Sequence, residues 1–117
     1  QGSLIHPGYS GVTLSLMHGA APSLMILCHK PSRKYIRDTR IPIPPLDLMV
    51  RMHEEIASYI RPARVVGIGL NCGDLTEEAA REEIRRAEDL TGLPANDYFR
   101  FGCDNLVEAV LEGGRQI

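Results

Sequence analysis

The chain has 117 residues, a formal net charge of −2 and an apolar fraction of 44%. A globular chain of this size buries roughly 60–70% of its unfolded surface, so we expect a single domain over residues 1–117 with an aliphatic core. Three widely spaced cysteines argue against a disulfide framework, and no apolar run approaches the roughly 20 residues of a membrane span. We therefore expect a cytoplasmic protein that binds neither membranes nor nucleic acid.

The first segment, residues 1–19, begins as a glycine-rich loop and is predicted to end as a helix. Ser10 is the expected N-cap, and the helix then carries an apolar side with Val12, Leu16 and Met17. A helix start of this kind offers free backbone N–H groups to an anion. The alternative is that the glycines only shape a tight connection and the histidines of the segment lie on the surface.

A buried strand and a basic loop are predicted next. Leu24–Cys28 is an unbroken apolar run, typical of a strand buried on both faces of a parallel sheet, and His29 lies at its carboxyl end. The following segment, 30–45, is first basic and then rich in proline, so we expect an irregular, extended loop. Residues 30–40 hold five basic side chains against one acidic. They either form a solvated run or gather a polyphosphate, such as ATP or the phosphates of acetyl-CoA.

The rest of the chain alternates between helices and strands. The periodicity and the breakers predict a helix at 46–60, a strand at 64–71, a helix at 76–91 that ends at Gly92, a short strand at 97–101 and a helix at 105–111 that ends at Gly113. Such alternation predicts an α/β fold with a mostly parallel sheet and helices on both faces.

Several motifs are absent from the sequence. The Gly67-Ile68-Gly69 stretch lacks the third glycine of a dinucleotide fingerprint, and neither lysine follows a glycine as a Walker A loop requires. No G-x-S-x-G elbow is present. The histidines and cysteines never fall at zinc-site spacing, so we expect no metal site.

Topology indicates where a ligand would bind. In open parallel sheets ligands bind outside the carboxyl ends of the strands, and three segments should meet there: residues 1–3, His29 with the basic loop, and residues 71–74. Asn71 follows an otherwise apolar strand. Its amide either holds a nucleobase edge or caps the next turn, and the sequence leaves both roles open.

A set of short phrases makes the chain resemble a known family. These phrases are Gln1-Gly2-Ser3-Leu4, His6-Pro7, Tyr9-Ser10-Gly11-Val12-Thr13-Leu14, His18-Gly19, Pro22, Leu27-Cys28-His29, Pro31 and Arg33. They are similar to the bacterial and archaeal P-loop family, formerly described only as a domain of unknown function, that includes the DgcN-type D-glutamate N-acetyltransferases. The resemblance implies a partial P-loop NTPase-like, three-layer fold.

The resemblance also places this chain within a longer protein. It covers nearly all of the chain and matches the C-terminal half of the family's P-loop domain. The Walker-type loop and an N-terminal Rossmann-like domain of the family have no counterpart in the sequence. The chain has no initiator Met, so we expect a fragment that is inactive alone.

The activity implied by the resemblance is transfer of an acetyl group from acetyl-CoA to the amine of D-glutamate or a similar amino acid. This needs a base, donors for an oxyanion, and cations for phosphates and carboxylates. The expected base is His6, His18 or His29, and the expected donors are the Ser3 side chain and the Gly2 backbone. The expected cofactor-binding residues are Gln1, Gly2, Lys30, Arg33, Lys34, Arg37 and Asn71.

Two other functions stay open. One is an ATP-dependent ligase or kinase of the dethiobiotin-synthetase-like P-loop type, which would use ATP and Mg²⁺, and the other is a non-catalytic nucleotide-binding or assembly module. We also expect a homo-oligomer, because two or three strands leave an apolar sheet edge that seeks a partner.

Overall fold

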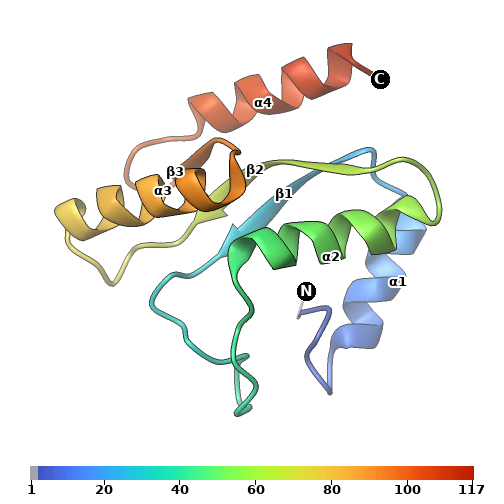
Figure 1. The fold of residues 1–117 in the computed structure, drawn as a ribbon, viewed down its shortest axis with the longest axis horizontal. Helices are drawn as coiled ribbons and strands as arrows, with labels where there is room; N and C mark the ends of the chain where they lie inside the picture. Colours follow the sequence, from blue (N-terminus) through green and yellow to red (C-terminus); the bar gives the residue numbers. More distant parts are fainter. Residues whose placement is uncertain (1–2) are drawn as a thin grey trace.

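The computed structural model describes residues 3–117. A three-stranded parallel sheet lies at the centre of the protein (Figure 1). The strands are β1 (Leu24–His29), β2 (Arg64–Leu70) and β3 (Ala95–Asp97), in the order β1-β2-β3. β2 pairs with both neighbours in parallel. The predicted α/β fold with a parallel sheet is thereby confirmed.

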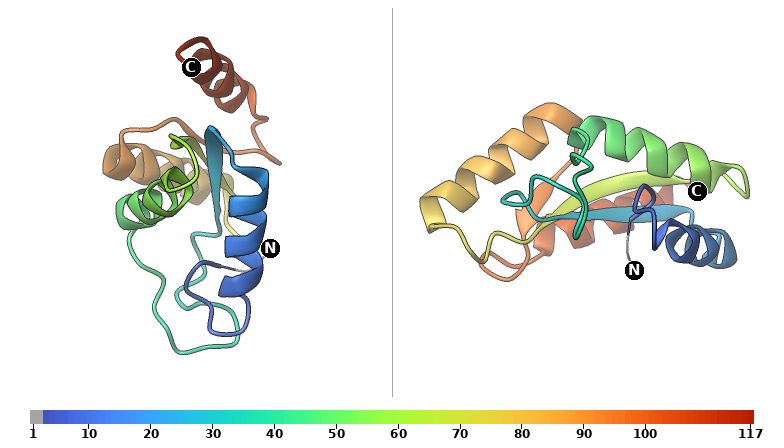
Figure 2. Two further views of the ribbon diagram at one scale, coloured as in Figure 1. Left: turned by 90° about the vertical axis from the view of Figure 1, so that its right-hand side faces the viewer. Right: turned by 90° about the horizontal axis from the view of Figure 1, so that it is seen from below.

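Four helices surround the sheet: α1 (Ser10–Ala20), α2 (Leu46–Ser58), α3 (Glu77–Thr91) and α4 (Asp104–Arg115). α2 and α3 cover one face and α4 covers the other, which gives three layers (Figure 2). A hydrogen bond from His18 of α1 to the Ile56 carbonyl of α2 joins these two helices. No helix within residues 3–117 is long and apolar enough to cross a membrane.

The core is centred on β2. Every residue of this strand after Arg64 is buried, and Ile68 and Leu70 have no exposed surface. Gly67 faces α4, and a Cβ placed there would lie 2.9 Å from Leu106 and 3.1 Å from Ile26. The missing side chain is therefore what allows α4 to approach the sheet so closely.

Helix α3 shows its expected end signals. Thr76 is the N-cap and its hydroxyl accepts a hydrogen bond from the Ala79 N–H at 3.1 Å, which satisfies one free donor of the first turn. Gly92 ends the helix in the left-handed region, with φ at 70°. Both positions confirm the predicted bounds.

The prediction that β1 is buried on both faces is wrong. Only Leu27 is fully buried in this strand, and Cys28 is exposed. The reason is position: β1 has a single neighbour, β2, so it forms one edge of the sheet. The apolar side chains predicted for α1 are likewise exposed, with Val12 at 42% and Leu16 at 55%.

Several element bounds also differ from the predictions, and α2 and β2 end one or two residues earlier, at Ser58 and Leu70. Ser10 is the first helical residue of α1 instead of its N-cap, because the Ser10 N–H already donates to the His6 carbonyl at 2.8 Å. β3 ends at Asp97, whose carboxylate accepts from the backbone N–H of the turn that follows. α4 continues through Gly113, which packs closely against Leu24.

Candidate functional site

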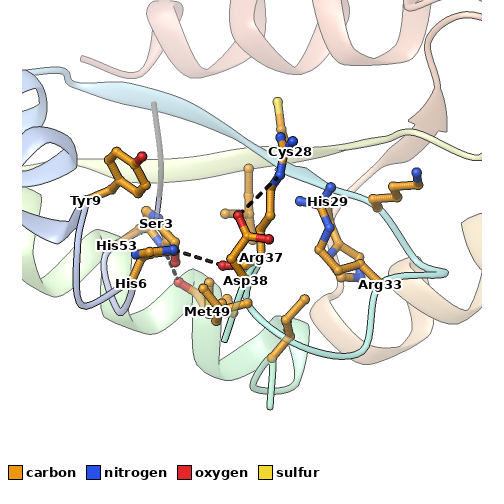
Figure 3. Close-up of a pocket in the computed structure, with 14 residues that line it drawn as sticks. Ser3, His6, Tyr9, Cys28, His29, Arg33, Arg37, Asp38, Met49 and His53 are labelled. Atoms are coloured by element: carbon orange, nitrogen blue, oxygen red, sulfur yellow. Dashed lines mark hydrogen bonds and ion pairs between the residues drawn. The ribbon is translucent and has the colours of Figure 1, made fainter. Parts of the chain in front are cut away.

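A cavity of about 580 Å³ opens at the carboxyl end of β1 (Figure 3). Its walls come from the N-terminal loop, the end of β1, the loop between β1 and α2, and the first turns of α2. The lining includes two hydroxyls, three histidines, three cations and one carboxylate: Ser3, Tyr9, His6, His29, His53, Lys30, Arg33, Arg37 and Asp38. Because ligands of parallel α/β sheets bind at this edge, we take the cavity as the candidate site.

The basic loop is folded back on itself instead of being extended as predicted. Tyr35 forms an antiparallel bridge with Pro42, and the Ile36 N–H donates to the Ile41 carbonyl at 2.9 Å. The Ile36 side chain is only 6% exposed and acts as an apolar anchor. These contacts within the loop give the cavity a wall of defined shape.

His6 lines the cavity, but both of its ring nitrogens already have partners. Nδ1 accepts a hydrogen bond from the Gly8 N–H, and Nε2 donates to the Arg37 carbonyl, both at 2.9 Å. The ring also contacts Tyr9, with 4.8 Å between the ring centroids. His6 therefore joins the N-terminal loop to the basic loop and has no lone pair left for a substrate.

His18 is not part of the cavity lining. Its Nε2 donates to the Ile56 carbonyl at 2.9 Å, so the ring connects α1 with α2. This arrangement gives His18 a structural contact at a distance from the other predicted site residues.

His29 lies where its strand predicts, at the end of β1 and in the cavity wall. Burial lowers the pKa of His29, and the charges of Arg33 and Lys34 lower it further, while Glu83 acts in the opposite direction. The ring is therefore neutral at neutral pH and offers a lone pair. Within residues 3–117 no three His, Cys, Asp or Glu side chains form a group suited to a metal ion.

His53 is a cavity residue that the sequence analysis missed. It lies on α2 one turn after Met49, and its Nδ1 is 2.7 Å from the Met49 carbonyl oxygen. The available signal is the spacing of four residues, which puts His53 on the same side of the helix as Met49. This spacing points to the site only when the position of the loop opposite α2 in the folded protein is known.

The predicted cations divide into two groups. Lys30, Arg33 and Arg37 line the cavity, whereas Lys34 lines only a neighbouring depression, which shares His29 and Arg33 with the cavity. Lys30 lies 3.9 Å from Asp74 and Arg37 lies 3.9 Å from Asp38, and both pairs are exposed. Pairs of this kind contribute little, so these cations stay free to bind an anion.

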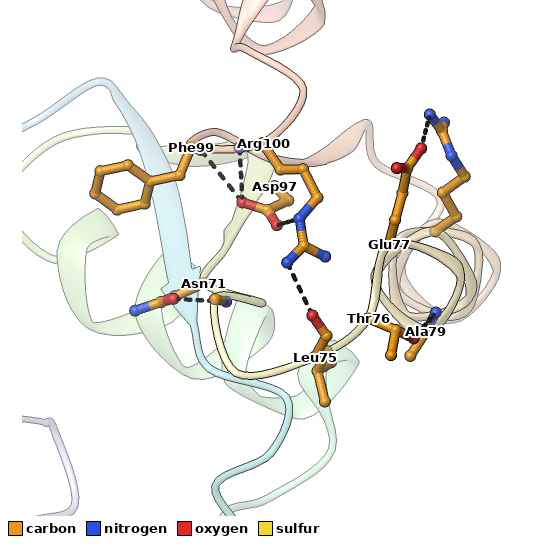
Figure 4. Close-up of polar contacts among 10 residues, drawn as sticks. Asn71, Leu75, Thr76, Glu77, Ala79, Asp97, Phe99 and Arg100 are labelled. Atoms are coloured by element: carbon orange, nitrogen blue, oxygen red, sulfur yellow. Dashed lines mark hydrogen bonds and ion pairs between the residues drawn. The ribbon is translucent and has the colours of Figure 1, made fainter.

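Asn71 is not part of the cavity lining. Figure 4 shows its side chain in the turn that follows β2. Its Oδ1 accepts from the Gly73 N–H at 3.2 Å, which is the turn-capping role of the two that the sequence left open. In the same turn, Asp74 accepts from the Ser32 hydroxyl at 2.6 Å, and this hydrogen bond lowers the pKa of Asp74. The turn after β2 thus holds the start of the basic loop.

A polar pair formed by the buried Asp97 and the half-buried Arg100 lies beyond this turn (Figure 4), and neither residue lines the cavity. Asp97 is 1% exposed, and its Oδ2 lies 4.0 Å from Arg100 Nε. Arg100 also donates to the Leu75 carbonyl at 2.8 Å. Burial, with a smaller contribution from Asp97, raises the pKa of the nearby Cys72 thiol to about 11.

Ser3 is the described part of the predicted N-terminal site, since Gln1 and Gly2 lie outside the described residues. The Ser3 hydroxyl oxygen accepts from the Ile5 N–H at 3.3 Å. Its own hydrogen is therefore available to a ligand. The geometry thus brings Ser3, His29 and the cations of the basic loop together at one cavity.

The sequence pattern of the family described as "Domain of unknown function (DUF1611_C) P-loop domain" matches residues 1–107. The chain belongs to this DUF1611 family. The resemblance stated from the sequence is confirmed by this match, and the three-layer structure agrees with a P-loop domain.

Two curated relatives of this DUF1611 chain are named D-glutamate N-acetyltransferase. The protein from Tritonibacter scottomollicae is 39% identical over 94% of this chain, and the one from a Pseudoalteromonas species is 32% identical over 92%. This chain spans 34% and 33% of their respective lengths. It thus corresponds to about a third of each relative.

A solved structure shares the fold. The crystal structure of a DUF1611 family protein from Anabaena variabilis matches 96% of this chain with a TM-score of 0.90 and 41% identity. Again the chain spans 34% of that protein. The P-loop-type α/β fold of the DUF1611 chain is therefore shown.

Proposed function

We propose that the cavity at the end of β1 is part of an N-acetyltransferase site that joins an acetyl group from acetyl-CoA to the amine of D-glutamate or a similar amino acid. The names of the two curated relatives support this activity. The observation that carries the proposal is the composition of the cavity, which combines a neutral histidine with three cations.

The cation wall suits the charges of both substrates. D-Glutamate carries two carboxylates, and acetyl-CoA carries phosphates, all of which form charge-assisted hydrogen bonds with Lys and Arg. Lys30, Arg33 and Arg37 line the cavity from the basic loop. The volume of about 580 Å³ falls within the usual range of about 300–1,000 Å³ for small-molecule sites.

The uncharged groups of the cavity suit the chemical step. The acceptor amine is an ammonium ion at neutral pH, so a neutral ring must take one proton before the nitrogen can attack the thioester carbonyl. His29 and His53 remain for this role, because His6 uses both ring nitrogens and His18 lies elsewhere. The free hydroxyl hydrogen of Ser3 can donate to the oxyanion that forms.

The first prediction tests the cation wall in the protein at its full natural length. Replacing Arg33 and Arg37 together by Ala should weaken acetyl-CoA binding at least about tenfold, because hydrogen bonds to charged groups contribute about 1.5–3 kcal/mol each. Isothermal titration calorimetry measures the affinity. The matched control replaces Arg85 and Arg115 by Ala, which removes the same charge from exposed ion pairs on α3 and α4.

Equal affinities of the two double variants would contradict the proposal. The same titrations with ATP separate acetyl transfer from the ligase or kinase alternative. Binding of ATP that depends on Arg33 and Arg37, together with phosphate release, would favour the alternative. N-Acetyl product formed without ATP would favour the acetyltransferase.

A further inference from the structure

His53 is a cavity residue to which neither the sequence motifs nor the names of the relatives give a role. We propose that His53 is the base that takes the proton from the ammonium group of the acceptor, an inference that rests on the acetyl transfer proposed above. It differs from that proposal by choosing one ring nitrogen, Nε2 of His53, as the proton acceptor. Three observations support the choice.

The first observation is a fixed tautomer. Nδ1 of His53 lies 2.7 Å from the carbonyl oxygen of Met49, and a carbonyl oxygen only accepts hydrogen bonds. Nδ1 therefore carries the hydrogen, and in the neutral ring the lone pair is on Nε2. The ring lines the cavity, and within residues 3–117 no hydrogen-bond donor satisfies Nε2. The ring is thus prepared to accept a proton at one defined atom.

The second observation is the rigid support of this ring. His53 and Met49 lie one turn apart on α2, so the hydrogen bond that orients the imidazole is made within a single helix. The helix is fixed on the sheet by the buried residues Val50 and Ala57. A base held in this way keeps its distance to a bound substrate, which acid–base catalysis requires.

The third observation concerns the other cavity histidines. His6 has partners on both ring nitrogens, so it cannot accept a proton without losing a hydrogen bond. His29 is partly buried beside Arg33 and Lys34, and these surroundings lower its pKa, so an added proton is disfavoured there. Within the described part of the chain, His53 has a hydrogen-bond partner on Nδ1 alone. His29 then serves as a neutral neighbour of the substrate.

The chemical step is balanced as follows. Nε2 of His53 takes one proton from the ammonium nitrogen, and the free amine attacks the carbonyl carbon of the thioester. A C–N bond forms, the C–S bond breaks, and coenzyme A leaves as a thiolate. The second proton of the amine passes to that thiolate. The products are the N-acetyl amino acid, the free thiol of coenzyme A and a protonated His53, which returns its proton to water.

The test uses the protein at its full natural length, with acetyl-CoA and D-glutamate as substrates. His53→Gln should lower kcat by about a hundredfold or more, because a positioned base contributes typically about 10²–10⁴-fold. Binding of acetyl-CoA should be unchanged. The matched control is Arg51→Gln, an exposed position on the same helix, which should keep the activity of the wild type.

A second measurement separates a base from a residue that only supports the fold. Free imidazole should restore part of the activity of His53→Ala, and the loss should be smaller with the hydrazino analogue of the acceptor, whose nitrogen is less basic. The inference would be overturned if imidazole restored no activity and the activity fell equally with D-glutamate and with its hydrazino analogue. A fully active His53→Gln would also overturn it. A wild type that forms no N-acetyl product would overturn the proposed function and, with it, the role of His53.

Discussion

Neighbouring strands β1 and β2 have similar apolar sequences but very different surroundings. β2 is paired on both sides and is buried along its whole length after Arg64, whereas β1 has one partner and a single fully buried residue, Leu27. The cavity lies at the end of β1, where polar and charged side chains remain accessible. The packing that stabilises the fold is therefore concentrated at β2, and the groups suited to chemistry lie at the edge strand.

The largest expected effect concerns the three thiols. Cys72, just after β2, has no exposed surface and its pKa is raised to about 11 by burial, whereas Cys28 on β1 and Cys103 are exposed. A thiol reagent should modify Cys28 and Cys103 quickly in the native protein. Cys72 should react at least about a thousandfold more slowly, because global unfolding of a domain typically costs about 5–15 kcal/mol.

Mass spectrometry of the labelled protein over time measures this difference. The control is labelling in denaturant, where all three cysteines should react alike. Rapid modification of Cys72 in native buffer would show that the region around the end of β2 is as accessible to the reagent as the edge strand β1. That result would contradict the difference in burial between the two strands.

A smaller effect on stability is expected from adding one methyl group at a glycine of β2 and, separately, at a glycine of α1. At Gly67 the new Cβ would lie 2.9 Å from Leu106 and 3.1 Å from Ile26, so Gly67→Ala should lower the free energy of unfolding by about 1–3 kcal/mol through overpacking. At Gly11 in α1 nothing lies within 4 Å, and Gly11→Ala should raise it by about 0.5–1 kcal/mol.

Urea unfolding of both variants beside the wild type gives the two changes. Changes of opposite sign in the free energy of unfolding would sharpen the comparison. The same added methyl group would then stabilise the protein at the exposed Gly11 and destabilise it at the buried Gly67. Equal stabilities of the two variants would contradict the close approach of α4 to β2.

The smallest effect is a pH dependence from His29. Its pKa in the folded protein is lowered from 6.5, mainly by burial, so below that pH the unfolded chain binds the proton more readily. The contribution of the neutral ring is therefore complete above pH 6.5 and is lost as the pH falls through the folded pKa. Chemical unfolding across this range should show a steeper loss of stability in the wild type than in His29→Gln. Identical pH profiles would mean that the ring is as solvated in the folded protein as in the unfolded chain.

Much of the fold was predictable because its signals are local. Helix α3 begins at a Thr N-cap and ends at Gly92, and both signals lie within a few residues of the bound they set. The end of β3 was not predictable in this way, because the turn depends on the buried carboxylate of Asp97. Burial of β1 was mispredicted for a similar reason, since apolar residues alone do not tell an edge strand from a central one.

The location of the candidate site was predictable from the sequence, but the full set of residues that line it was not. The rule for parallel sheets placed His29 and the basic loop at one edge, and both line the cavity. His53 was missed because the loop that shares the cavity with it is held by contacts between residues far apart in the sequence, such as the hydrogen bond from His6 to the Arg37 carbonyl. Acetyl-CoA binding, homo-oligomer formation and a cytoplasmic location stay predictions.

The place of the basic loop in the chain has an evolutionary consequence. The loop lies within the connection from β1 to β2, which any pair of parallel strands must have, so it adds a cavity wall without adding a new crossing of the sheet. The entropy of closing such a connection grows only with the logarithm of its length, and doubling the length costs about 0.6 kcal/mol. This segment can therefore be lengthened, shortened or recharged at little cost to stability, so the wall of the cavity can change while the fold does not.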